Sequence, residues 1–101
     1  MRKLLQAAIL TAASLTSTLP ALGCGSGDEQ VFKSIEAMPA APLFRCGAQF
    51  NVALARAKAG DWQGALTAYQ AHLRQLAEAG TQVAGSEATL TYLLQRARAS
   101  S

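Results

Sequence analysis

The chain of 101 residues has a formal net charge of +3, and half of its residues are hydrophobic. Two of its nine basic residues, Arg2 and Lys3, open the chain, and the part from residue 24 onward holds seven basic and six acidic residues. No cluster of lysine and arginine is left there to follow a phosphate backbone, so we expect no nucleic-acid partner. Those 78 residues suffice for one small domain, which buries about 60–65% of its unfolded surface.

Residues 1–23 have the pattern of a cleaved signal peptide. A basic pair precedes an apolar run over residues 4–15, and the small residues Ala21 and Gly23 then occupy the −3 and −1 positions of a cleavage site. The apolar run is too short to span a bilayer comfortably. The sequence therefore predicts export from a bacterial cytoplasm.

The residue that follows this cleavage site decides where the exported protein goes. The segment Leu22-Gly23-Cys24, with Gly25-Ser26-Gly27 after it, resembles the lipobox of bacterial lipoproteins. The resemblance implies that Cys24 carries a diacylglyceryl thioether and that this lipid binds the protein to a membrane. A lipoprotein of this kind lies at the outer or inner membrane and faces the periplasm.

The cysteine count allows a second fate. The chain has two cysteines, Cys24 and Cys46, and an exported chain with two cysteines can close one disulfide, worth about 3 kcal/mol to a small domain. Ordinary cleavage after Gly23 would then leave a soluble periplasmic or extracellular protein. If Cys24 carries lipid instead, we expect Cys46 to be a small buried residue on the helical face of Phe50. The two fates exclude each other.

Residues 24–42 are expected to form a flexible tether with at most one short helix. Ser26 and Glu29 have the spacing of a capping box at the start of that helix. The two prolines within residues 38–42 then keep the residues before them out of helical conformation. We therefore place a small helical domain at residues 43–101.

From residue 43 onward the apolar residues recur at the three-and-four spacing of amphipathic helices, and no segment has the pattern of a strand. Gly60 ends the first expected helix, Asp61 can cap the second, and Gly80 ends that one. Ser86 is expected to cap the third. The fold class is therefore all-α. The three apolar stripes are Cys46, Phe50, Ala53, Leu54 and Ala57; Trp62, Ala65, Leu66, Tyr69, Leu73 and Leu76; and Leu90, Leu93, Leu94 and Ala97.

The first two of these helices, in residues 46–79, resemble a single tetratricopeptide (TPR) unit. The segment Gly60 to Tyr69, GDWQGALTAY, is similar to the turn and second helix of that family, in which a small residue precedes an aromatic one by four. Ala53 matches the small residue of the first helix. The resemblance implies an antiparallel TPR-like hairpin, and the third helix would pack against it.

Residues that could carry out chemistry are few and scattered. His72 is the only histidine, and no base, nucleophile or carboxylate lies at a spacing that would form a relay with it. We expect His72 on the flank of its helix or at the surface. Two cysteines and one histidine without close spacing do not make a metal site. We therefore expect no catalytic residues, no metal, no cofactor, no small-molecule substrate and no enzymatic activity.

Two aromatic residues are candidates for contact with a partner. Trp62 begins the second helix within its apolar stripe, which favours core packing, whereas Tyr92 points away from the leucines of the third helix. The sequence favours a non-catalytic, membrane-anchored lipoprotein that acts as a protein-interaction accessory of an envelope assembly, of secretion or conjugation type. Its partners would be envelope proteins. The alternative is a freely secreted helical effector or inhibitor with a Cys24–Cys46 disulfide.

Overall fold

The computed structural model describes residues 27–100, so the expected signal peptide and the lipobox-like Cys24 lie outside the described residues. Within this range the chain is all-α, as the sequence predicts, and contains no strand. Its elements are α2 (Asp28–Ser34), the short 3-10 helix η1 (Ile35–Ala37), α3 (Ala48–Lys58), α4 (Trp62–Glu78) and α5 (Ser86–Ala99).

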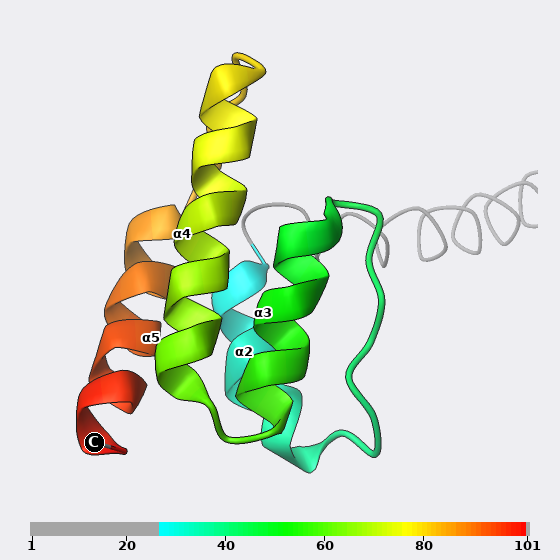
Figure 1. Ribbon diagram of the computed structural model, residues 1–101, viewed down its shortest axis with the longest axis vertical. Helices are drawn as coiled ribbons and strands as arrows, with labels where there is room; N and C mark the ends of the chain where they lie inside the picture. The colour runs from blue at the N-terminus through cyan, green and yellow to red at the C-terminus, as the bar shows by residue number, and fades with distance from the viewer. Residues whose placement is uncertain (1–26, 101) are drawn as a thin grey trace, which may run out of the picture.

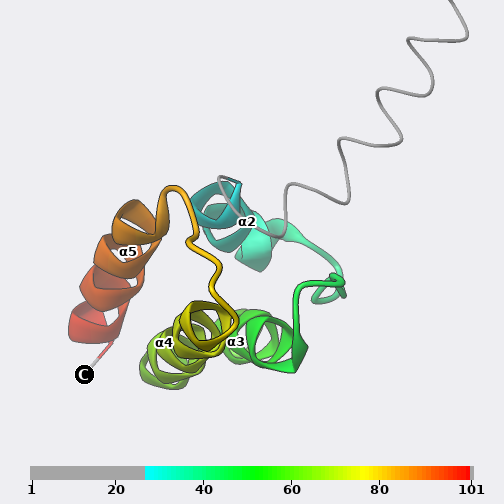
Figure 2. The ribbon, with the colours of Figure 1, turned by 90° about the horizontal axis from the view of Figure 1, so that it is seen from above.

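The helices enclose one core. α3 and α4 form an antiparallel hairpin with the largest interface of the fold, and α5 packs on the other side of α4 (Figure 1). Seen from above, α2 lies opposite α4 and bridges the outer helices, because it packs against α5 while η1 packs against α3 (Figure 2). The predicted hairpin with a packing helix is thus present, and α2 closes its open side.

The expected ends of α3 and α4 are confirmed, and both have the same geometry. Gly60 and Gly80 adopt the left-handed conformation, with φ of +85° and +80°. After α3, the Gly60 N–H donates to the carbonyl of Ala57 at 3.0 Å and the Asp61 N–H to the carbonyl of Arg56 at 2.8 Å. This pair of bonds is the Schellman motif, which satisfies carbonyls that the helix itself leaves open.

Asp61 caps α4 as predicted. Its Oδ1 accepts a hydrogen bond from the Gly64 N–H at 2.9 Å, which satisfies one of the free donors at the helix start. In the present conformation a Cβ atom at position 64 would collide with the Asp61 carboxylate, so a larger residue there would force the Asp61 side chain to shift. Arg56 approaches the same carboxylate at 3.1 Å from the end of α3.

The expected cap of α5 is wrong. Ser86 is the first helical residue, and the N-cap position is taken by Gly85, whose φ is +79° and which makes no side-chain cap. Because Gly85 takes the N-cap position in a left-handed conformation, the helix begins at Ser86, one residue earlier than it would if Ser86 were the cap. The hydroxyl of Thr89 instead donates to the Gly85 carbonyl at 3.3 Å.

The short helix expected before the prolines exists as α2, but it does not behave as a flexible tether. Phe32 and Ile35 are fully buried, and the Phe32 ring meets Phe50 and Tyr69 edge-on at centroid distances of 6.0 and 5.7 Å. Three helices rich in alanine leave a thin core that α2 completes. The helical core therefore includes Phe32 and Ile35, which lie in the segment expected to be a tether.

The buried apolar core draws on every helix. Alanine supplies five of its members, so the helices approach closely, and aromatic rings fill the wider centre. The core residues are Phe32, Ile35, Phe50, Ala53, Leu54, Ala57, Trp62, Ala65, Leu66, Ala68, Tyr69, Leu93 and Ala97.

Candidate partner-binding site

The two aromatic residues that the sequence singled out lie against each other. Trp62 of α4 is 3% exposed, as its place in the stripe predicts, and Tyr92 of α5 meets its ring edge-on at 6.0 Å. Tyr92 is half-buried, and Leu94 is 39% exposed, so the expected order of faces on α5 is wrong. The reason is α2, which covers the side of α5 that a three-helix fold would leave open.

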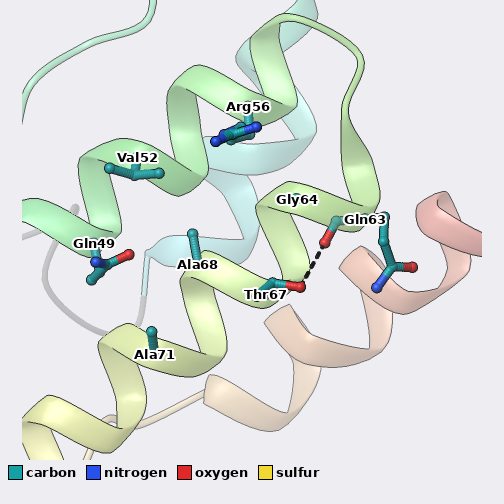
Figure 3. A pocket seen from close by; sticks show the side chains of 8 residues that line it. All are labelled: Gln49, Val52, Arg56, Gln63, Gly64, Thr67, Ala68 and Ala71. Atoms are coloured by element: carbon teal, nitrogen blue, oxygen red, sulfur yellow. Dashed lines mark hydrogen bonds between the residues drawn. The ribbon is translucent and has the colours of Figure 1, made fainter.

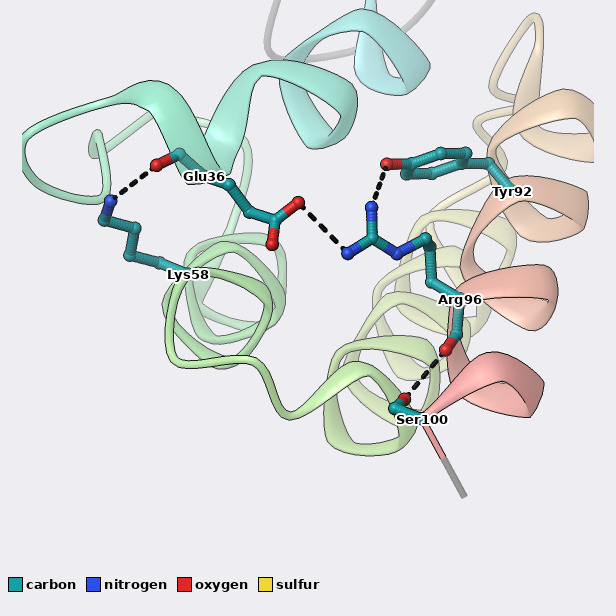
Figure 4. Close-up of polar contacts among 5 residues, drawn as sticks. All are labelled: Glu36, Lys58, Tyr92, Arg96 and Ser100. Carbon is teal, nitrogen blue, oxygen red and sulfur yellow. Dashed lines mark hydrogen bonds and ion pairs between the residues drawn. The ribbon is translucent and has the colours of Figure 1, made fainter.

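Arg96 holds this aromatic pair in place. Its guanidinium lies over the Trp62 ring, with the central carbon 4.3 Å from the ring centroid. One terminal nitrogen donates to the Tyr92 hydroxyl at 3.2 Å, and the other pairs with the Glu36 carboxylate at 3.0 Å (Figure 4). A planar guanidinium can stack and form a fork of hydrogen bonds at once, which lysine cannot. Trp62, Tyr92 and Arg96 are called the aromatic–arginine cluster below.

Charged side chains surround the cluster on the α2 side. Lys33 lies 5.7 Å from the centroid of the Tyr92 ring and pairs with Glu29 one turn earlier at 2.9 Å. The backbone carbonyl of Glu36 accepts from Lys58 of α3 at 3.2 Å (Figure 4). The charged side chains around the cluster therefore come from α2, η1 and α3.

A hollow of about 510 Å³ adjoins the cluster between α2 and α5. Tyr92 and Lys33 belong both to the hollow and to the contacts just described, so an aromatic ring, a cation and a carboxylate border the same space. Such a set can receive a polar or aromatic side chain of a protein partner. The lining residues are Glu29, Lys33, Ala88, Thr91, Tyr92 and Gln95.

A smaller groove, of about 320 Å³, follows the outer face of the α3–α4 hairpin (Figure 3). Its most exposed large apolar residue is Val52, at 39%. The hydroxyl of Thr67 is engaged with the Gln63 carbonyl at 3.1 Å, and Arg56 is engaged with Asp61. No aromatic residue lines this groove. The face between α2 and α5 is therefore the richer candidate surface.

Cys46 does not lie on the face of a helix. It occupies the turn before Gly47, is partly buried, and is disulfide-bonded. The chain has only one other cysteine, Cys24, which lies outside the described residues. Since a sulfur atom in a disulfide cannot also carry a thioether lipid, the bonded state of Cys46 bears directly on the two fates of Cys24.

Behind the cluster, polar side chains meet inside the core. The Tyr69 hydroxyl donates to Oδ2 of Asp28 at 2.9 Å, and Asp28 is 1% exposed. Burial, and next the charge of Asp28, raises the pKa of Tyr69. This hydrogen bond joins α2 to α4 and explains how a carboxylate is tolerated in the core.

His72 is buried, not at the flank or surface as expected. It is 1% exposed, and the centroid of its ring lies 5.2 Å from the ring centroid of Phe50 and 5.8 Å from that of Tyr69. α4 has neighbours on more than one side, so its buried arc is wider than the apolar stripe. Burial lowers the pKa of His72.

Sequence reasoning missed Arg96 and Glu36 as parts of the site. Arg96 follows Tyr92 by four residues, a spacing that places both on one face of α5. The contact of Arg96 with Glu36 could not be inferred from local sequence patterns, because the two residues are 60 positions apart.

Within residues 27–100 no three histidine, cysteine or acidic side chains gather where they could hold a metal ion. Among the described helices none is both long and apolar enough to cross a bilayer. Comparisons of the chain with protein family models, with curated proteins and with solved structures found no match.

Proposed function

We propose that this protein is an exported, non-catalytic helical protein that binds another protein through the aromatic–arginine cluster. One observation carries the proposal: Arg96 is fixed by Trp62, Tyr92 and Glu36, yet its side chain keeps 35% of its surface exposed, and Tyr92 beside it lines a hollow. Tryptophan, tyrosine and arginine are the residues most often found at the energetic centres of protein interfaces. Side chains held in one conformation before binding also lose little entropy on association.

The bonded state of Cys46 supports the secreted form of this function. In that form the mature protein is a soluble effector or inhibitor closed by a Cys24–Cys46 disulfide. The second candidate is the membrane-anchored lipoprotein accessory of an envelope assembly, of secretion or conjugation type. It is supported by the lipobox-like Leu22-Gly23-Cys24. Both forms would use the same binding surface.

Intact-mass measurement of the mature protein from its native host separates the two forms. The secreted form is expected in the soluble fraction with a mass lacking two hydrogens, which return on reduction. A diacylglyceryl adduct on Cys24 in the membrane fraction would instead establish the lipoprotein. A Cys24→Ser variant should then leave the membrane.

The binding surface is tested by site-specific photo-cross-linking in cells. A cross-linking residue at position 95, in the hollow, is expected to give a defined protein adduct, whereas the same residue at exposed position 74 is not. Arg96→Ala should weaken binding to the partner so identified by about 2 kcal/mol or more, and Arg74→Ala should leave it unchanged. Thermal unfolding of each variant checks that the fold persists. Equal adducts at both positions would contradict the proposal.

A further inference from the structure

His72 has an environment that suits only its neutral form. It is the sole histidine of the chain, lies on α4, and is 1% exposed. Its Nε2 has no hydrogen-bond partner in the part of the chain that the structure describes. A neutral imidazole presents one donor and one acceptor nitrogen, whereas the protonated ring presents two donors and a positive charge. A buried charge without a partner is costly, so protonation works against this packing.

The groups around the ring offer it no partner charge. Phe50 faces it from α3, and Tyr69 faces it from α4 itself. At Gly47, in the turn before α3, an added Cβ atom would lie 3.8 Å from Nδ1, and the preceding Cys46 is disulfide-bonded and does not titrate.

The rest of the core adds one acidic group. Among residues 27–100, Asp28 of α2 carries the only buried carboxylate, and its Oδ2 accepts a hydrogen bond from the Tyr69 hydroxyl. The buried residues of α3 and α5 are uncharged. Burial alone accounts for the lowered pKa of His72, with no contribution from a neighbouring charge.

We propose that His72 is an acid-sensitive switch, whose protonation loosens the packing of α4 against the turn that carries Cys46. The contact at risk is local, because the ring lies between α4, Phe50 and the backbone of Gly47. The turn would open first, and Cys46, which is partly buried in the folded protein, would become more accessible to solvent.

The direction of the pH dependence follows from the lowered pKa of His72 in the fold. In the unfolded chain the histidine titrates near 6.5, so the unfolded state binds the proton first as the pH falls. The contribution of neutral His72 to the free energy of unfolding is therefore fully present above about pH 6.5. It declines as the pH falls toward the lower pKa of the folded state. In that window the unfolding equilibrium constant rises by at most about tenfold per pH unit. Ordinary carboxylates titrate near pH 4, so their titration does not obscure the pH dependence that comes from His72.

The test uses the oxidised mature protein and two readouts between pH 7.5 and 5.0. The urea midpoint of the wild type is expected to fall with pH, whereas those of His72→Leu and His72→Gln stay level. Reduction of the disulfide by a phosphine, which acts in acid, should accelerate in the wild type relative to either variant. Asp28→Asn, which keeps the histidine, should retain the wild-type slope.

Two outcomes would overturn the switch. One is a wild-type midpoint and reduction rate that follow the same pH course as the variants. The other, which needs no variant, is an NMR titration of the His72 ring in the folded protein with a pKa at or above 6.5. A titration below 6.5 together with a falling wild-type midpoint supports it, even where neither substituted protein folds.

Discussion

Two interfaces of α4 are built in different ways. The buried residues of α3 and α4 include two alanines from each helix, and the two helices are neighbours in the chain. Toward α2, contact depends on the Phe32 ring and on the hydrogen bond from Tyr69 to Asp28, which joins residues 41 positions apart. The first interface follows from a repeated pattern of small residues. The second depends on a few individual groups, so single substitutions should affect it most.

The largest effect is expected from Phe32→Ala. The ring is fully buried among aromatic neighbours, so its removal should lower the free energy of unfolding by about 3–5 kcal/mol. Urea denaturation measures this loss. Leu43→Ala is the control, because Leu43 is 85% exposed and should tolerate truncation. If both variants were equally stable, residues 28–37 would be a tether and not part of the core.

A smaller effect is expected from Tyr69→Phe, which deletes only the hydroxyl donor to Asp28. Loss of a buried hydrogen bond costs about 1–3 kcal/mol, and the upper end is expected because the acceptor is a carboxylate. Amide hydrogen exchange should rise more in α2 than in α3, since the bond holds α2 in place. Uniform acceleration across both helices would contradict the difference between the two interfaces.

The smallest effect concerns the helix caps. Asp61→Ala should lower the melting temperature by a few degrees, because Gly64 loses the acceptor of its N–H, whereas Ser86→Ala should change it little. The Gly64 hydrogen bond, and next Arg56, keep the pKa of Asp61 below its usual value. The wild-type cap is therefore present above the ordinary aspartate pKa and is lost as the pH falls through the lowered one. Equal shifts in both variants would mean that Asp61 does not cap α4.

The sequence predicted the parts of the fold that depend on local signals. Gly60, Asp61 and Gly80 act within a turn of their own helix, so their roles could be inferred without knowledge of the neighbours. Ser86 was misassigned because Gly85, one residue earlier, took the cap position in a left-handed conformation. A serine and a glycine side by side leave that choice open at the level of sequence.

The errors at Tyr92 and His72 have one common cause. Each residue was placed by a helical stripe that assumes a single neighbouring surface, whereas α4 and α5 each contact more than one element. At Tyr92 the second neighbour is α2, whose Lys33 lies beside the ring. At His72 it is α3 together with the turn before it, through Phe50 and Gly47. The site at Arg96 could not be predicted, because Glu36 reaches it from a distant part of the chain.

The position of α2 has a consequence for the order in which the chain can fold. α2 precedes every other described helix in synthesis, yet one of its main contacts is with α5, the last. Asp28 cannot accept its hydrogen bond until Tyr69 has been synthesised, and Glu36 cannot pair until Arg96 has been. Until the carboxyl-terminal residues emerge, Phe32 and Ile35 have an incomplete surface to pack against. Of the described helices, the first to be made is thus the last to be fully buried.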